Sequence, residues 1–252
     1  MSKFQVAGKS EGGKRPESNE DYFVADSAMG LYLICDGVGW AAGGEVASRL
    51  AAETVTQTIT QQRRSLDTIH SITSAMVVSA ISKAFEKIGN RSRTDDRLQG
   101  MGTTLTMLLI DNVRTIVGHL GDSRLYLVRN DELHQLTCDH PMTETLQQDT
   151  AIVTEPDVFE LLLRPGDVLL LGTDGLNVVF EDEMWVTTVV REQNVHEIAN
   201  TLLARQDDLG DHQDATIVVI RVCSNNPPAI GVRHHLPTGY RAFQMIEACA
   251  NV

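Results

Sequence analysis

The order of the predicted secondary-structure elements constrains the fold of this 252-residue chain most strongly. Two long helical segments, at 43–62 and 65–88, follow one another directly, with apolar residues recurring at helical spacing. Strand-like segments precede them, and a longer run of strands follows. Because helices do not alternate one for one with strands, the pattern disfavours a doubly wound parallel sheet. It favours antiparallel sheets covered by helices, an α+β fold.

Short apolar runs bounded by turn residues predict the strands. Asn130-Asp131 lies at one of the tight turns, where both residues tolerate left-handed backbone geometry. The tail 223–252 opens with a Pro- and Asn-rich stretch and is interpreted as an appendage. The predicted strands cover 22–27, 31–35, 103–110, 113–119, 123–129, 132–136, 158–163, 167–172 and 215–222, and a further helix is predicted at 194–206.

Two of these strands end in Asp-Gly. Asp36-Gly37 follows an apolar run at 31–35, and Asp174-Gly175 follows another at 168–171. A carboxylate at a buried strand end, beside a glycine whose carbonyl is accessible, suits a hard divalent cation such as Mg²⁺ or Mn²⁺. A single Asp-Gly is usually only a turn. The repetition, together with further acids at strand ends, predicts a dinuclear metal centre.

The remaining acids of this constellation also lie at the ends of strands. Each has an ordinary alternative, because a solvated or turn-capping acid is common in such loops. Because these acids occur together, in order, at strand ends of one chain, a metal-binding role is favoured over that alternative. The acids are Glu20, Asp21, Asp122, Asp211 and Asp214.

Composition excludes several classes of function. The formal net charge of −13 leaves no basic stripe for nucleic acid or an anionic membrane. No apolar stretch approaches the roughly 20 residues of a membrane span, and the first fifteen residues lack the apolar segment of a signal peptide. The four cysteines form no Cys-x-x-Cys pair that would suggest zinc. We therefore expect a cytoplasmic protein.

The ordered motifs resemble those of metal-dependent serine/threonine protein phosphatases of the protein phosphatase 2C type, in their bacterial single-domain form. The resemblance covers residues 4–222 and implies a four-layer α/β/β/α sandwich of two antiparallel sheets, with a catalytic domain at 1–222. The motifs that carry it are Arg15…Asn19-Glu20-Asp21, Asp36-Gly37-Val38-Gly39, Gly102-Thr103-Thr104, Gly121-Asp122-Ser123-Arg124, Thr137-Cys138-Asp139-His140, Thr173-Asp174-Gly175 and Asp214-Ala215-Thr216.

The resemblance also implies roles for particular residues. Asp36 would bridge two Mn²⁺ or Mg²⁺ ions, with the Gly37 carbonyl, Glu20 or Asp21 completing the second ion's shell. Asp174 and an acid before the last strand would hold the first ion, and Asp122 a third, weaker one. Metal-activated water would attack the phosphorus directly. Arg15 is expected to bind the substrate phosphate, because a guanidinium offers two parallel donors.

Three features depart from the family pattern. Gln213 stands where the last motif normally has its metal-binding Asp, so Asp214, favoured because it is adjacent, or Asp211 must replace it. The segment from Thr143 to Pro156 is too short for the usual flap beside the substrate cleft. In addition, Arg15 lies one residue farther than usual from the Glu-Asp pair, and Trp40 replaces a glycine.

The leading hypothesis is a monomeric phosphatase that acts on phosphoserine and phosphothreonine in the protein substrates of a cognate Ser/Thr kinase. Gln213 and the short flap leave two alternatives open. One is a pseudophosphatase that binds phosphoproteins without turnover. The other is a partner-switching phosphatase that acts on the phosphoserine of an anti-sigma antagonist.

Overall fold

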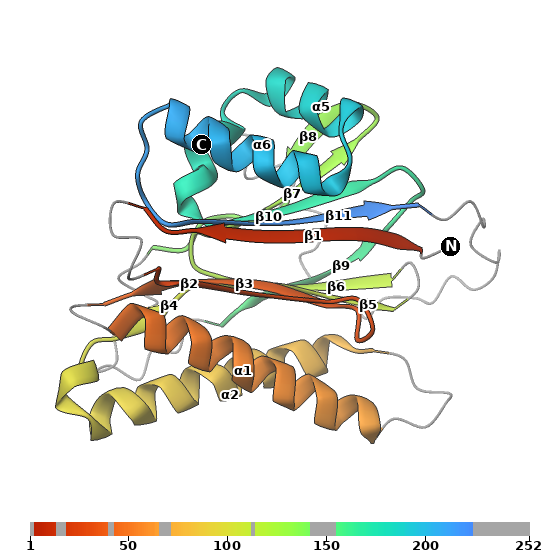
Figure 1. Ribbon diagram of the computed structural model, residues 1–252. Coiled ribbons are helices and arrows are strands. Elements are labelled where there is room, and N and C mark those ends of the chain that lie inside the picture. The colour runs from red at the N-terminus through yellow and green to blue at the C-terminus, as the bar shows by residue number, and fades with distance from the viewer. Residues whose placement is uncertain are drawn as a thin grey trace.

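The fold has four layers, in the order helices, sheet, sheet, helices (Figure 1). The computed structural model describes residues 3–13, 19–39, 43–65, 72–111, 114–141 and 155–223. Every strand pairing within these residues is antiparallel. The predicted α+β sandwich of two antiparallel sheets flanked by helices is therefore confirmed.

The first sheet has the strand order β2-β3-β5-β6-β9, with the short β4 paired to β3. Its central strands are buried along almost their whole length because both faces of the sheet are covered. The strands are β2 (Asp21–Asp26), β3 (Leu31–Val38), β4 (Gly102–Thr103), β5 (Leu105–Asp111), β6 (Arg114–Leu120) and β9 (Asp157–Leu162).

The second sheet has the order β1-β11-β10-β7-β8. Strand β1 runs antiparallel to β11 over its full length, from the pair Phe4–Val222 to the pair Glu11–Ala215. The strands are β1 (Phe4–Glu11), β7 (Arg124–Arg129), β8 (Glu132–Gln135), β10 (Val168–Gly172) and β11 (Ala215–Val222).

Two groups of helices cover the outer faces of the sheets (Figure 1). Helices α1 (Gly43–Arg64) and α2 (Ser74–Thr94) pack their apolar faces on the first sheet and enclose one core. Helices α4 (Asn177–Phe180), α5 (Glu183–Glu192) and α6 (Val195–Asp208) enclose another core against the second sheet. A third core, including Ile34, Leu171 and Val218, fills the space between the two sheets.

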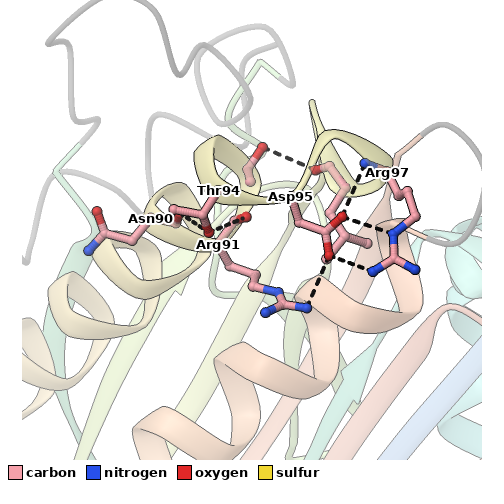
Figure 2. A network of polar contacts seen from close by, with 7 residues as sticks. Asn90, Arg91, Thr94, Asp95 and Arg97 are labelled. Atoms are coloured by element: carbon pink, nitrogen blue, oxygen red, sulfur yellow. Dashed lines mark hydrogen bonds and ion pairs between the residues drawn. The ribbon is translucent and has the colours of Figure 1, made fainter.

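The C-terminal end of α2 is held by a surface network of charged side chains (Figure 2). Asp95, just after the helix, accepts from Arg91 at 3.1 Å and from Arg97 at 2.9 Å. The Asp95 side chain also accepts a hydrogen bond from the Arg97 backbone N–H. Asp95 thereby caps the start of a 3-10 turn, η1 (Asp96–Leu98). Because the side chains of Arg91 and Arg97 are exposed, the network contributes little free energy, but it marks where the helix ends.

Some predicted boundaries differ from the structure. The predicted start of the second helix at 65 is wrong, since residues 72–73 are not helical and α2 begins at Ser74. The helix also continues through the polar stretch 89–94, for which the sequence predicts a loop. Strand β1 and helices α4 and α5 are absent from the sequence-based prediction. The two positive backbone φ angles at Asn130 and Asp131 confirm the predicted tight turn.

None of the helices in the described ranges combines the length and apolar character that a bilayer crossing requires. The predicted C-terminal appendage covers residues 223–252, of which the structure describes Cys223 alone. The Cys223 backbone N–H donates to the Lys3 carbonyl at 2.8 Å, so this end of β11 stays beside the start of β1.

Candidate metal centre

The candidate site lies where the two sheets approach each other at one end of the sandwich. Asp21, the first residue of β2, is the register partner of Asp36 near the end of β3. Directly opposed residues of an antiparallel pair have Cβ atoms about 4.5–5.5 Å apart. The first sheet therefore presents two carboxyl groups side by side.

The second sheet contributes Asp174, which begins a 3-10 turn, η2 (Asp174–Leu176), immediately after β10. The carboxyl groups of Asp36 and Asp174 face each other across the two sheets, close enough for the charge of Asp174 to raise the pKa of Asp36. Thr173 links the sheets a second time, since its hydroxyl donates to Asp21 Oδ2 at 2.8 Å. The same hydroxyl oxygen accepts the Thr216 N–H of β11 at 2.9 Å.

Burial and like charge make ionisation of this cluster unfavourable. Burial raises the pKa of Asp21 to about 7, and the charges of Asp214 and Asp174 add to the effect. The pKa of Asp36 is raised well above its ordinary value by burial and by the charges of Asp21 and Asp174. The pKa of Asp174 is raised by burial and by the charges of Asp211 and Asp214. A bound cation would favour the ionised carboxylates and so offset these shifts.

Backbone and hydroxyl groups fix the position of Asp36. Its N–H donates to Thr104 Oγ1 at 3.0 Å, and its carbonyl accepts from the Thr104 N–H and the Thr103 hydroxyl, both at 2.8 Å. The Thr104 hydroxyl is in turn 2.6 Å from that of Ser123. The Gly-Thr-Thr motif therefore belongs to the site, because its two threonine hydroxyls hold the backbone of Asp36. The sequence alone gives no role for these hydroxyls.

Gly37 lies at a close approach of three backbone segments. Its N–H donates to the Glu20 carbonyl at 3.1 Å. A Cβ atom on Gly37 would lie 2.2 Å from the Gly44 carbonyl oxygen and 2.6 Å from that of Glu20. The Glu20 carboxylate itself lies over Gly44, where an added Cβ would be 2.8 Å from Oε2. Glu20 is thus placed at the N-terminal end of α1, which favours a negative charge.

Asp122, between β6 and β7, faces the same cluster from one side. Its pKa is raised by burial and by the charge of Asp174. One carboxylate oxygen, Oδ1, is buried and has no hydrogen-bond partner among the described residues. A buried acceptor without a donor is unfavourable unless a cation or water satisfies it.

Asp214 lies just before β11, and both of its carboxylate oxygens accept hydrogen bonds from backbone N–H groups. Oδ1 accepts the Gly13 N–H at 2.7 Å, and Oδ2 accepts the Glu20 N–H at 2.8 Å. These bonds join the end of β1 to the start of β2. The structure therefore brings Asp21, Asp36, Asp122 and Asp174 together, and places Asp214 at their edge.

Gln213 is exposed, and its backbone is tied into the loop before β11. Its N–H donates to Asp211 Oδ1 at 3.1 Å, and its carbonyl accepts from the buried Gln206 amide at 3.0 Å. Arg15, Trp40 and most of the shortened flap segment (142–154) lie outside the described residues. Their predicted roles stay predictions.

The donor set fits a hard divalent cation. All the side-chain donors are carboxylate oxygens, and Asp21 Oδ1 is a second buried acceptor without a partner among the described residues. Within those same ranges, no three His, Cys, Asp or Glu side chains converge on one point at coordinating distance.

Comparison with known proteins identifies relatives along nearly the whole described chain. A family model described as protein phosphatase 2C matches residues 13–214. Protein phosphatase PhpP of Streptococcus pneumoniae is 25% identical over 235 residues, which cover 82% of this chain and 93% of that protein. The serine/threonine protein phosphatase PstP of Mycobacterium tuberculosis is 29% identical over 240 residues, covering 87% of this chain but 45% of PstP.

Solved structures agree with this result. A crystal structure of Mycobacterium tuberculosis PstP superposes with a TM-score of 0.75 at 28% identity, covering 88% of this chain and 99% of that one. The PstP catalytic domain in complex with two manganese ions gives a TM-score of 0.74 at 29% identity, with the same coverage. The four-layer sandwich and the family resemblance inferred from the motifs are both confirmed.

Proposed function

The chain belongs to the protein phosphatase 2C family, a family of protein serine/threonine phosphatases, and we propose that it hydrolyses phosphoserine and phosphothreonine with a divalent metal centre. The observation that carries the proposal is the meeting of acids from both sheets: Asp21 and Asp36 are register partners on one sheet, and Thr173, beside Asp174 of the other, donates to Asp21. Like-charged carboxyls held together at a strand end are costly unless a cation compensates them. The manganese-bound PstP structure supports the same interpretation.

Asp36, Asp174 and Asp21 would hold the ions, with the Gly37 carbonyl, Glu20 and Asp122 around them. Mn²⁺ or Mg²⁺ in such a site lowers the pKa of water and offsets charge on the phosphoryl oxygens. The protein's own contribution is orientation. Thr103 and Thr104 fix the backbone of Asp36, and Thr173 fixes the carboxylate of Asp21.

The direct transfer of the phosphoryl group to water needs no nucleophilic side chain. Cys35, which precedes Asp36 on the same strand, is fully buried, and burial raises the pKa of its thiol. A thiol held in its neutral form is a poor nucleophile. We propose Arg15 as the phosphate-binding guanidinium, and the protein substrates of a Ser/Thr kinase as the partners.

The test is hydrolysis of p-nitrophenyl phosphate and of matched phosphoserine, phosphothreonine and phosphotyrosine peptides. We expect activity with added Mn²⁺, its loss in EDTA, and a preference for the first two peptides. Asp36→Asn and Asp174→Asn should each lower kcat by about 100-fold or more, as for loss of a group that supports transition-state charge. Glu86→Gln, an exposed change on α2, is the matched control.

Equal rates in Mn²⁺ and EDTA would contradict the proposal. Metal binding without turnover of any phosphopeptide would instead support the alternative of a phosphoprotein-binding module, for which Gln213 is the motivating residue.

A further inference from the structure

The turn that carries Asp122 is held by one histidine from a later segment of the chain. The Gly121 N–H donates to His140 Nδ1 at 3.1 Å, and the Gly121 carbonyl accepts the His140 backbone N–H at 2.8 Å. We propose that His140 is a positioning residue, which fixes the backbone of Gly121 and thereby the place of the Asp122 carboxylate. The inference rests on the proposed function, because Asp122 belongs to that site.

The conformation of Gly121 explains why such a support is needed. Its backbone φ is 115°, a value that favours glycine, and an added Cβ would lie 2.6 Å from the Cβ of Thr104. Glycine is also the residue with the most backbone freedom to lose on folding. Because His140 bonds both the N–H and the carbonyl of Gly121, it restricts this freedom and sets the direction in which the chain enters Asp122.

The same turn is fastened to the residues that hold Asp36. The Ser123 hydroxyl is 2.6 Å from Thr104 Oγ1, and that oxygen accepts the Asp36 N–H at 3.0 Å. Asp122 lies between Gly121 and Ser123, so both of its neighbours have fixed positions. Its Oδ1 is buried and has no hydrogen-bond partner in the described part of the chain. A displacement of Gly121 would therefore move an oxygen that is available to a cation.

The ring of His140 is itself held by the first sheet. Because Nδ1 accepts from Gly121, the neutral ring carries its proton on Nε2, which lies 3.3 Å from Asp157 Oδ2. The His119 ring stacks on the His140 ring, with centroids 5.0 Å apart and 21° between the planes. His119 and Asp157 are register partners on β6 and β9. Two neighbouring strands thus hold the imidazole in the tautomer that can accept from Gly121.

The first measurement is calorimetric titration of the metal-free, full-length chain with Mn²⁺, and the quantity compared is the binding that Asp122→Asn removes. His140→Asn keeps an acceptor at the position of Nδ1, His140→Gln keeps a polar group only near that of Nε2, and His140→Leu keeps neither. We expect His140→Gln and His140→Leu to weaken this binding by about tenfold. His140→Asn should remain close to the unaltered chain.

The matched control is His196→Leu, which removes an exposed histidine at the start of α6. It should leave the Mn²⁺ affinity unchanged. Thermal melting in EDTA verifies that each variant is folded.

A double-variant cycle tests whether His140 acts through Asp122. In a chain that already carries Asp122→Asn, the further change His140→Leu should alter neither the remaining Mn²⁺ affinity nor kcat. A positioning residue has no effect once the group that it positions is lost, whereas independent residues give losses that add.

A second measurement needs no metal. Hydrogen exchange of the Gly121 amide in EDTA, followed by NMR, should be about tenfold faster in His140→Leu and His140→Gln than in His140→Asn or the unaltered chain. The ¹⁵N chemical shifts of the His140 ring should show an unprotonated Nδ1 and a protonated Nε2. A protonated Nδ1 at neutral pH would overturn the proposal.

The proposal is also overturned if His140→Asn weakens Mn²⁺ binding as much as His140→Leu, if the losses from His140→Leu and Asp122→Asn add, or if Asp122→Asn removes no binding. The proposed function survives each of these results provided that Asp36→Asn abolishes Mn²⁺ binding. If Asp36→Asn also leaves Mn²⁺ binding unchanged, the metal centre itself is refuted, and with it the proposed function.

Discussion

The Thr173 hydroxyl donates to Asp21 Oδ2 at 2.8 Å and so joins an acid of one sheet to a strand end of the other. The same oxygen accepts the backbone N–H of Thr216. A single buried hydroxyl thus satisfies a carboxylate and a backbone donor at once, which makes its removal informative.

Thr173→Val should lower the free energy of unfolding by about 1–3 kcal/mol, because a buried carboxylate and a backbone N–H both lose a partner. Thr173→Ser keeps the hydroxyl and should lose much less. Urea denaturation of the metal-free proteins measures the difference. Equal stabilities of the valine and serine variants would show that the methyl packing, and not the hydrogen bonds, is what matters.

Gly37→Ala should lower the free energy of unfolding by about 1–3 kcal/mol, since the added methyl has only backbone atoms to displace. The matched control is Gly89→Ala within α2, where an added Cβ would meet only a side-chain atom of Arg93 at 3.4 Å. That change should raise the stability by about 0.5–1 kcal/mol, as alanine is the better helix residue. If Gly37→Ala leaves the free energy of unfolding unchanged, the backbone of the site can shift at little cost.

Asp36→Asn should make the metal-free protein more stable at pH 8 while abolishing phosphatase activity. The folded pKa values of Asp36 and Asp21 are raised, so these acids hold protons that the unfolded chain has released. Stability of the metal-free protein therefore falls as the pH rises from about 4 through about 7, the folded pKa of Asp21. Melting temperatures in EDTA between pH 5 and pH 8 measure this, with Glu86→Gln as the control.

The same comparison with Mn²⁺ present should reverse the order, because the ions bind only the protein with intact carboxylates. A melting temperature of the unaltered chain that does not respond to Mn²⁺ would contradict both halves of this prediction.

His119 should remain uncharged down to about pH 4, because burial and the neighbouring His140 ring lower its pKa. Its Nδ1 lies 2.9 Å from the Thr106 hydroxyl and its Nε2 3.0 Å from the Cys138 carbonyl. The unfolded chain takes up this proton near the ordinary histidine pKa of 6.5, so His119 costs stability as the pH falls from 6.5 to about 4. The slope is at most about 1.4 kcal/mol per pH unit, opposite in sign to that of Asp21.

Because the contributions of His119 and Asp21 to the pH dependence of stability oppose each other, stability measurements alone do not separate them. The chemical shifts of the histidine rings, followed by NMR as a function of pH, report on His119 directly. A His119 titration midpoint near 6.5 would contradict the prediction. The exposed His196, at the start of α6, is an internal reference in the same spectra.

The antiparallel sheets covered by helices, and the placement of two acids at strand ends, could be predicted from the sequence because both depend on local patterns. Apolar runs that end in Asp-Gly identify Asp36 and Asp174 as strand ends without any knowledge of their neighbours. Strand β1 escaped prediction because it lies at an edge of its sheet and only Ala7 is buried, so its apolar pattern is weak. The last turn of α2 escaped it because its polar residues, such as the buried Ser92, are satisfied by contacts beyond the helix.

The position of Asp214 could not be predicted for a related reason. Its partners, Gly13 and Glu20, are about two hundred residues away in the chain and are reached only through the pairing of β1 with β11. Adjacency to Gln213 in the sequence therefore says little about where its carboxylate points.

The register of β1 and β11 also determines where a fused or attached partner would lie. The pair Glu11–Ala215 lies at the acidic end of the sandwich, whereas Phe4–Val222 lies at the other end of the same strands. Eight residues of strand separate the two ends, roughly 25 Å at the usual rise. A label or reporter joined before Phe4 or after Cys223 would thus lie at the end of the sandwich remote from the metal-binding acids. The two attachment points would be neighbours.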